Sequence, residues 1–142
     1  LGIMAPMFAT MTVKKENMRL AAERGTFIPT CLENQLCRGA MGDVLGLAGL
    51  RFAGFEPRSP YDPAQALSGI TKAPRKGADV ERPFGEWNVL EVELKGDTLV
   101  NRVNGVELNR LSGISVARGA IALQAEGGAI QFRNVWVEEK AR

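Results

Sequence analysis

Residues 99–109 read LVNRVNGVELN, two apolar-rich runs around an Asn-Gly pair. Asn104-Gly105 is the preferred two-residue loop of a type I′ β-hairpin, because both loop positions need positive φ. Pairing across this loop places Val103 opposite Val106 and Arg102 opposite Glu107, which are favourable cross-strand pairs. The stretch therefore predicts antiparallel strands over 98–103 and 106–110.

Other parts of the chain carry the same kind of signal. Alternating or apolar runs bounded by glycine turns predict further strands over 32–37, 44–52, 88–95, 120–125 and 130–138. Residues 13–24 are rich in helix formers and are followed by a glycine, which favours a short helix or an ordered insertion. Residues 56–83 hold most of the prolines and few apolar residues, so we expect a long surface loop on the rim of the fold. Short strands at this spacing indicate an all-β sandwich or jelly roll.

Composition excludes several classes of function. The 142 residues suffice for one domain with one core, residues 1–142. Basic and acidic residues number 18 and 16, and no long basic run occurs, which argues against a nucleic-acid partner. No apolar stretch reaches the length of a membrane span. The chain begins with leucine and shows no signal-peptide pattern, so the natural N-terminus is expected to lie elsewhere.

The sequence contains no histidine, which removes the commonest general base and metal ligand. Any catalysis then falls to carboxylates, Lys, Tyr or Cys. Cys31 and Cys37 are too far apart along one strand for a disulfide. We interpret them as free thiols, and we expect neither a metal site nor a cofactor.

Several motifs occur together in a recognisable order. They are LENQLCRGAMGD from residue 32, Gly85 to Asn88, the Asn104-Gly105 hairpin, Gly119 to Gln124, and Phe132 to Asn134. This combination resembles the C-terminal two thirds of the 3-keto-disaccharide hydrolase domain family, over residues 32–139. The resemblance implies a concanavalin-A-like sandwich of two curved antiparallel sheets, here lacking some of the family's N-terminal strands.

The resemblance also implies carbohydrate chemistry on the concave face of the sandwich. The substrates would be glycosides or disaccharides whose C3 hydroxyl is oxidised to a ketone, and a periplasmic or secreted location would fit. Such a ketone acidifies the C2 proton, so a base can remove it and expel the C1 substituent, after which water adds. Two other functions stay open: a non-catalytic carbohydrate-binding module, and an interaction domain without a sugar site. The oligomeric state also stays open.

Glu33 is the best candidate for the base. It shares a strand face with Gln35, opposite Leu32 and Leu36, so the pair would face the sugar if the leucines face the core. A solvated outer face is the alternative. Asp43 is a second candidate base, although an aspartate at a turn commonly caps its own backbone.

Other polar side chains are candidates for sugar binding. Arg51 follows in the next strand, and Gln124 and Arg133 could line the concave face or hold structural hydrogen bonds. Glu126 occupies the turn where the family often has a histidine. We expect core positions for Trp87 and Trp136. Tyr61, in the long loop, could stack on a sugar. The loop cations Lys72, Arg75 and Lys76 are expected to be solvated.

Overall fold

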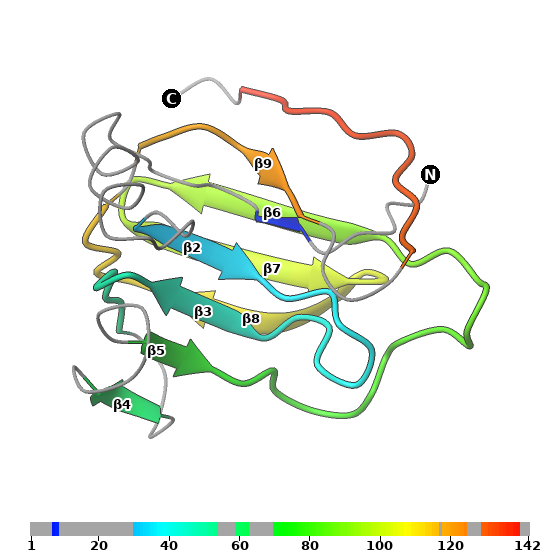
Figure 1. The fold of residues 1–142 in the computed structure, drawn as a ribbon, viewed down its shortest axis with the longest axis horizontal. Helices are drawn as coiled ribbons and strands as arrows, with labels where there is room; N and C mark the ends of the chain where they lie inside the picture. The colour runs from blue at the N-terminus through cyan, green and yellow to red at the C-terminus, as the bar shows by residue number, and fades with distance from the viewer. Residues whose placement is uncertain are drawn as a thin grey trace.

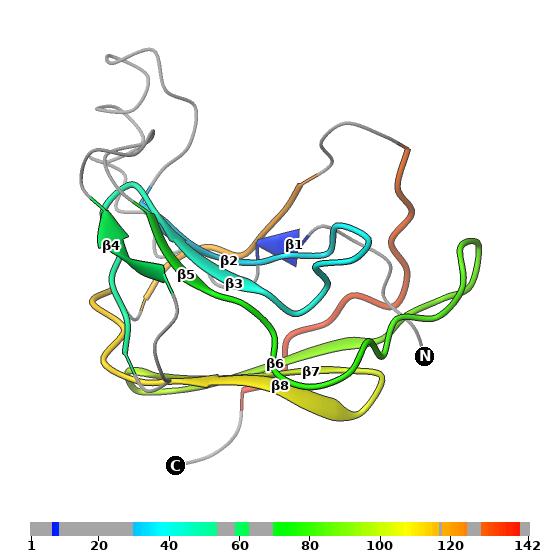
Figure 2. The ribbon, with the colours of Figure 1, turned by 90° about the horizontal axis from the view of Figure 1, so that it is seen from below.

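The structure is a computed structural model that describes residues 7–8, 30–53, 59–62, 70–116, 118–124 and 129–139. Throughout these residues the regular secondary structure is β, in two antiparallel sheets that lie one above the other (Figures 1 and 2). This arrangement confirms the all-β, concanavalin-A-like sandwich. The helix expected at 13–24 lies outside the described residues.

The larger sheet has six strands in the order β4-β5-β3-β2-β1-β9. Their bounds are β1 Met7–Phe8, β2 Cys31–Asn34, β3 Val44–Leu47, β4 Ser59–Asp62, β5 Ile70–Ala73 and β9 Ala122–Leu123. The smaller sheet has three strands in chain order, β6 Leu90–Lys95, β7 Thr98–Val103 and β8 Val106–Leu111. In Figure 2 strands β2, β3 and β5 form the upper layer and strands β6, β7 and β8 the lower one.

The hairpin forms as predicted. Strands β7 and β8 pair with Val103 opposite Val106 and Arg102 opposite Glu107. Asn104 and Gly105 both have positive φ, 51° and 83°. Asn104 does more than turn the chain, because its amide nitrogen donates to Val80 O and to Asn88 Oδ1, both at 2.8 Å. The hairpin loop thereby holds the segment that leads into β6.

The core lies between the two sheets. Alternate residues of β2 and of β7 point into it, because successive side chains of a strand face opposite sides. In β8 the alternation is broken by a register shift, and the consecutive residues Leu108 and Asn109 are both buried. Two clusters of buried apolar residues fill this space: Leu32, Val44, Leu50, Phe52, Ala73, Leu99, Leu111 and Ile114 in one, and Leu36, Met41, Leu90, Val103 and Leu108 in the other. The predicted inward orientation of Leu32 and Leu36 is confirmed.

Buried asparagines also cross this interior. Asn101 Nδ2 donates to Asn34 Oδ1 at 3.0 Å and to Gly42 O at 2.9 Å. Asn109 Nδ2 donates to the same Gly42 O at 2.7 Å and to Ala73 O at 3.2 Å. All three side chains are at most 1% exposed. The hairpin therefore contacts the loop between β2 and β3 through hydrogen bonds as well as apolar packing.

Four predictions about secondary structure are wrong in whole or in part. Residues 56–83 contribute strands β4 and β5 where only a loop was expected. Proline did not prevent a strand there because β4 lies at the edge of its sheet, where a missing N–H costs no ladder hydrogen bond. The strand expected at 120–125 contracts to β9, and that at 44–52 ends at Leu47, where Ala48 and Gly49 turn with positive φ.

The strand expected over 130–138 is the fourth error. Residues 130–138 form no strand in the structure, and Asn134 has a φ of 53°, which interrupts an extended chain. Trp136, expected in the core, is 58% exposed. Trp87 is half-buried and not a full core residue.

Candidate functional site

The face of the six-stranded sheet turned away from β6, β7 and β8 carries the candidate site, and we call it the outer face. Since Leu32 and Asn34 point inward, Cys31 and Glu33 of β2 point to the outer face. Cys31 is packed there against Leu47. Burial, and then the nearby charge of Glu33, raise the pKa of the Cys31 thiol to about 12. This effect of Glu33 agrees with the position of Cys31 and Glu33 on the same face of β2.

One cross-strand row of the outer face is chemically informative. Glu33 of β2 lies opposite Leu45 of β3, and Leu45 lies opposite Lys72 of β5. Side chains in one row of a sheet share a face, so a carboxylate and an ammonium flank a leucine. Lys72 was expected to be a solvated loop residue; instead it belongs to a strand of the sheet.

Asp43 joins this group from the residue before β3. Its side chain is only 7% exposed, and its Oδ2 lies 3.0 Å from Lys72 Nζ. Its Oδ1 accepts the backbone N–H of Arg75 at 2.8 Å. Asp43 thus ties the start of β3 to the end of β5 and fixes the direction of the Lys72 side chain.

Gln35 is half-buried beside this group, and its side chain is used locally. Gln35 Oε1 accepts the N–H groups of Leu36 and Cys37, both at 3.1 Å. Its backbone N–H donates to Asp43 O at 2.8 Å. The amide therefore stabilises the turn that follows β2, and its predicted contact with a sugar stays a prediction.

The remaining candidates are dispersed. Arg51 is exposed and follows β3, whereas Asp43 precedes that strand, so the two lie at opposite ends of β3. The backbone of Arg51 forms hydrogen bonds with Ser115. The Arg133 guanidinium lies 3.9 Å from the ring centroid of Trp87. Gln124 follows β9, which is separated from β2 by β1. Glu126 lies outside the described residues, as does the side chain of Tyr61, whose backbone belongs to β4.

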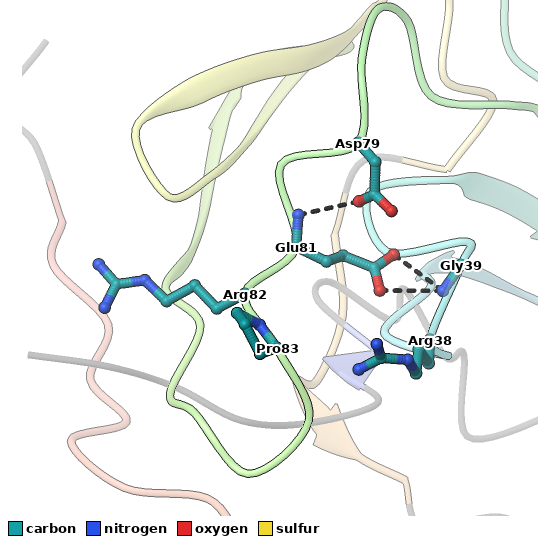
Figure 3. A pocket seen from close by; sticks show the side chains of 6 residues that line it. All are labelled: Arg38, Gly39, Asp79, Glu81, Arg82 and Pro83. Carbon is teal, nitrogen blue, oxygen red and sulfur yellow. Dashed lines mark hydrogen bonds between the residues drawn. The ribbon is translucent and has the colours of Figure 1, made fainter.

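A pocket of about 280 Å³ adjoins the β2–β3 loop (Figure 3). It is lined by Arg38, Gly39, Asp79, Glu81, Arg82 and Pro83. The Glu81 carboxylate accepts the backbone N–H of Gly39 at 2.9 Å and that of Met41 at 3.0 Å. In Figure 3 the Arg82 side chain extends away from the other charged groups.

Arg75 connects the pocket to the outer face. Its backbone N–H bonds Asp43, while its guanidinium bonds Glu81 at 3.1 Å and Asp79 at 3.0 Å. The backbone N–H of Glu81, and then the Arg75 guanidinium, hold the pKa of Asp79 below its ordinary value. Arg75 was expected to be solvated, which is wrong because its side chain is only 16% exposed. Glu81 was not predicted, because its only signal was charge near a proline-rich segment.

Within the described ranges, no cluster of three or more His, Cys, Asp or Glu side chains could hold a metal ion. The described part of the chain also contains no helix that is long and apolar enough to cross a membrane.

Comparison with known families now adds to this geometry. A family model described as the 3-keto-alpha-glucoside-1,2-lyase-like domain matches residues 19–138. The chain belongs to this family. Membership in the 3-keto-alpha-glucoside-1,2-lyase-like family indicates carbohydrate-related activity, and it confirms the resemblance seen in the motifs. No curated protein and no solved structure matches the chain.

Proposed function

We propose that this lyase-like domain cleaves 3-keto-glycosides, with Glu33 as the base that removes the C2 proton. The observation that supports the proposal is the position of Glu33. It is half-buried on the outer face, two residues after Cys31 on β2 and opposite Leu45 of β3. A carboxylate partly shielded from water is suited to proton abstraction. Asp43 has a different part in this proposal, because its two oxygens bond Arg75 and Lys72.

The reaction proceeds in two stages. Glu33 takes the C2 proton, the C–H electron pair becomes the C2=C3 double bond, and the carbonyl electrons move onto the C3 oxygen to give an enolate. When the carbonyl re-forms, the C1–O bond breaks, a C1=C2 double bond forms, and the departing oxygen takes a proton from an acid, a role that protonated Glu33 can fill. Water then adds across this double bond to give the free 3-keto sugar. This route uses a base, stabilisation of the enolate oxygen and an acid for the leaving group, and it needs no carboxylate pair flanking the glycosidic bond.

The test is turnover of a 3-keto-glucoside that carries a nitrophenyl group at C1, followed by absorbance. The same substrate in D₂O reports exchange of the C2 proton by NMR. Glu33→Gln keeps the size of the side chain and removes its basicity, so we expect both rates to fall roughly 10²–10⁴-fold. Glu91→Gln, an exposed glutamate of β6, is the matched control and should leave both rates unchanged.

Two outcomes would contradict the proposal. If Glu33→Gln exchanges and cleaves at the wild-type rate, the base lies elsewhere, with Asp43 and Glu126 as the next candidates. If the wild-type protein binds glycans but neither exchanges nor cleaves the 3-keto sugar, the domain is a carbohydrate-binding module.

A further inference from the structure

We propose that Lys72 is a catalytic residue that binds the C3 carbonyl oxygen and stabilises the enolate charge, and that Asp43 is the residue that positions it. This inference rests on the proposed function and assigns the second group which that reaction requires. A base alone does not suffice, because the negative charge that develops on oxygen needs a donor placed beforehand.

The sheet places Lys72 at a suitable separation from Glu33. The two residues occupy one cross-strand row with the strand of Leu45 between them. Neighbouring strands lie about 4.8 Å apart, so the two α-carbons are separated by roughly 10 Å. Both side chains rise on the outer face, and half-buried Leu45 lies between them. In this proposal one sugar ring lies above the leucine, with C2 toward Glu33 and the C3 oxygen toward Lys72.

Exposure of the two charged partners differs in a way that suits this role. The Lys72 side chain is 40% exposed, whereas that of Asp43 is 7% exposed. An ammonium group has three N–H donors, and the contact with Asp43 occupies one side of it. The lysine is therefore anchored from below by a buried carboxylate and accessible from above.

Asp43 is itself held in place from two directions. The Arg75 N–H bonds its Oδ1, and its own carbonyl accepts the Gln35 N–H. The Lys72 ammonium is thus fixed through a carboxylate that belongs to neither β2 nor β5. Preorganisation of this kind lowers the cost of ordering the cation when charge develops.

The experiment compares Lys72→Met and Lys72→Arg in the full chain, with Lys95→Met as the matched control. Lys95 is an exposed lysine of β6, on the other sheet. We expect Lys72→Met to lower kcat and C2-proton exchange about 10²–10³-fold with little change in KM. Lys72→Arg should recover part of the exchange rate because it retains a cation. Asp43→Asn should lower kcat less than Lys72→Met, again with KM nearly constant.

The results that would overturn the inference are distinct from those that would overturn the function. If the wild-type protein exchanges and cleaves, and Lys72→Met matches it, Lys72 has no catalytic role although the function stands. If the wild type does neither, the function fails, and the role of Lys72 fails with it. A covalent substrate adduct on Lys72 after borohydride treatment would show Schiff-base formation and would also overturn the electrostatic role. Circular dichroism and thermal unfolding of each variant exclude loss of fold as the cause.

Discussion

Asn101 and Asn109, on neighbouring strands of the hairpin, donate hydrogen bonds to a single oxygen, the backbone carbonyl of Gly42. That carbonyl lies in the loop between β2 and β3 of the other sheet. The two sheets are therefore joined at one peptide group by two buried amides. The arrangement suggests where the sandwich is most sensitive to substitution.

Asn101→Ala should destabilise the protein by about 2–3 kcal/mol, because it removes donors from Asn34 Oδ1 and Gly42 O inside the core. Urea unfolding followed by circular dichroism measures this change. Arg102→Ala, the next residue of β7, is the control, since its ion pairs with Glu93 and Glu107 are partly exposed and should cost under about 1 kcal/mol. Equal losses in the two variants would contradict the structural role of the buried amide.

Gly42→Ala should be far more damaging than Gly39→Ala. Both glycines have positive φ, 93° and 83°, so alanine is strained at either position by about 1–2 kcal/mol. A Cβ at Gly42 would in addition collide with the side chain of Leu108, whereas a Cβ at Gly39 would meet no atom within 4 Å. The difference between the two variants isolates the packing contribution, and a Gly42→Ala midpoint in urea equal to that of Gly39→Ala would show that the packing tolerates a methyl group.

The two thiols should react very differently. Cys31 is fully buried with its pKa raised to about 12, while Cys37 is exposed. A thiol reagent at pH 8 should titrate one cysteine in the folded protein and two in urea. Mass mapping of the labelled peptide should identify Cys37, and labelling of Cys31 at the same rate would contradict its burial.

Alkaline pH should also weaken the fold through Cys31. The neutral thiol is favoured in the folded state, so the folded protein retains a proton that the unfolded chain loses near its ordinary pKa of 9.0. The associated stability is complete below about pH 9 and is lost as the pH rises toward 12. Cys31→Ala should flatten this part of the stability profile, and an unchanged profile would exclude the thiol as its source.

Arg133→Ala should change the environment of Trp87, because the guanidinium lies over its ring. Fluorescence in a Trp136→Phe background reports Trp87 alone, since the sequence contains two tryptophans. We expect a shifted emission and a loss of about 0.5–1 kcal/mol of stability. Arg110→Ala, whose guanidinium bonds Glu107 instead of an aromatic ring, should leave the emission unchanged.

Local signals predicted the hairpin and the inward face of β2. Asn104-Gly105 defines its turn by the φ values it permits, and Leu32 with Leu36 defines a face by alternation alone. The strand expected at 130–138 shows the limit of this reasoning. Residues 130–138 do alternate, yet they form no strand, and Asn134 has a left-handed φ of 53° that interrupts an extended chain.

The candidate site was harder to predict, because strand pairing in the larger sheet brings its residues together. Glu33, Gln35 and Asp43 were predicted as candidates from one short stretch of sequence. Lys72 was not predicted as a site residue, because its position depends on the pairing of β5 with β3. The sequence of residues 70–73 alone does not specify the register of that pairing. Arg75 and Glu81 were missed for the same reason, since their partners lie some 30 to 40 residues away in the chain.

The carbonyl shared by Asn101 and Asn109 belongs to the peptide bond that joins Gly42 to Asp43. The hairpin belongs to the sheet opposite the proposed site. It therefore holds the backbone of Asp43, the residue that positions Lys72 in the proposed mechanism. In a screen for activity, substitutions at Asn101 or Asn109 should lower turnover as substitutions at Glu33 do, although the two asparagines lie in the core and not at the proposed site. Substitutions that reduce turnover should therefore fall in two places, at the contact between the two sheets and at the proposed substrate-binding surface.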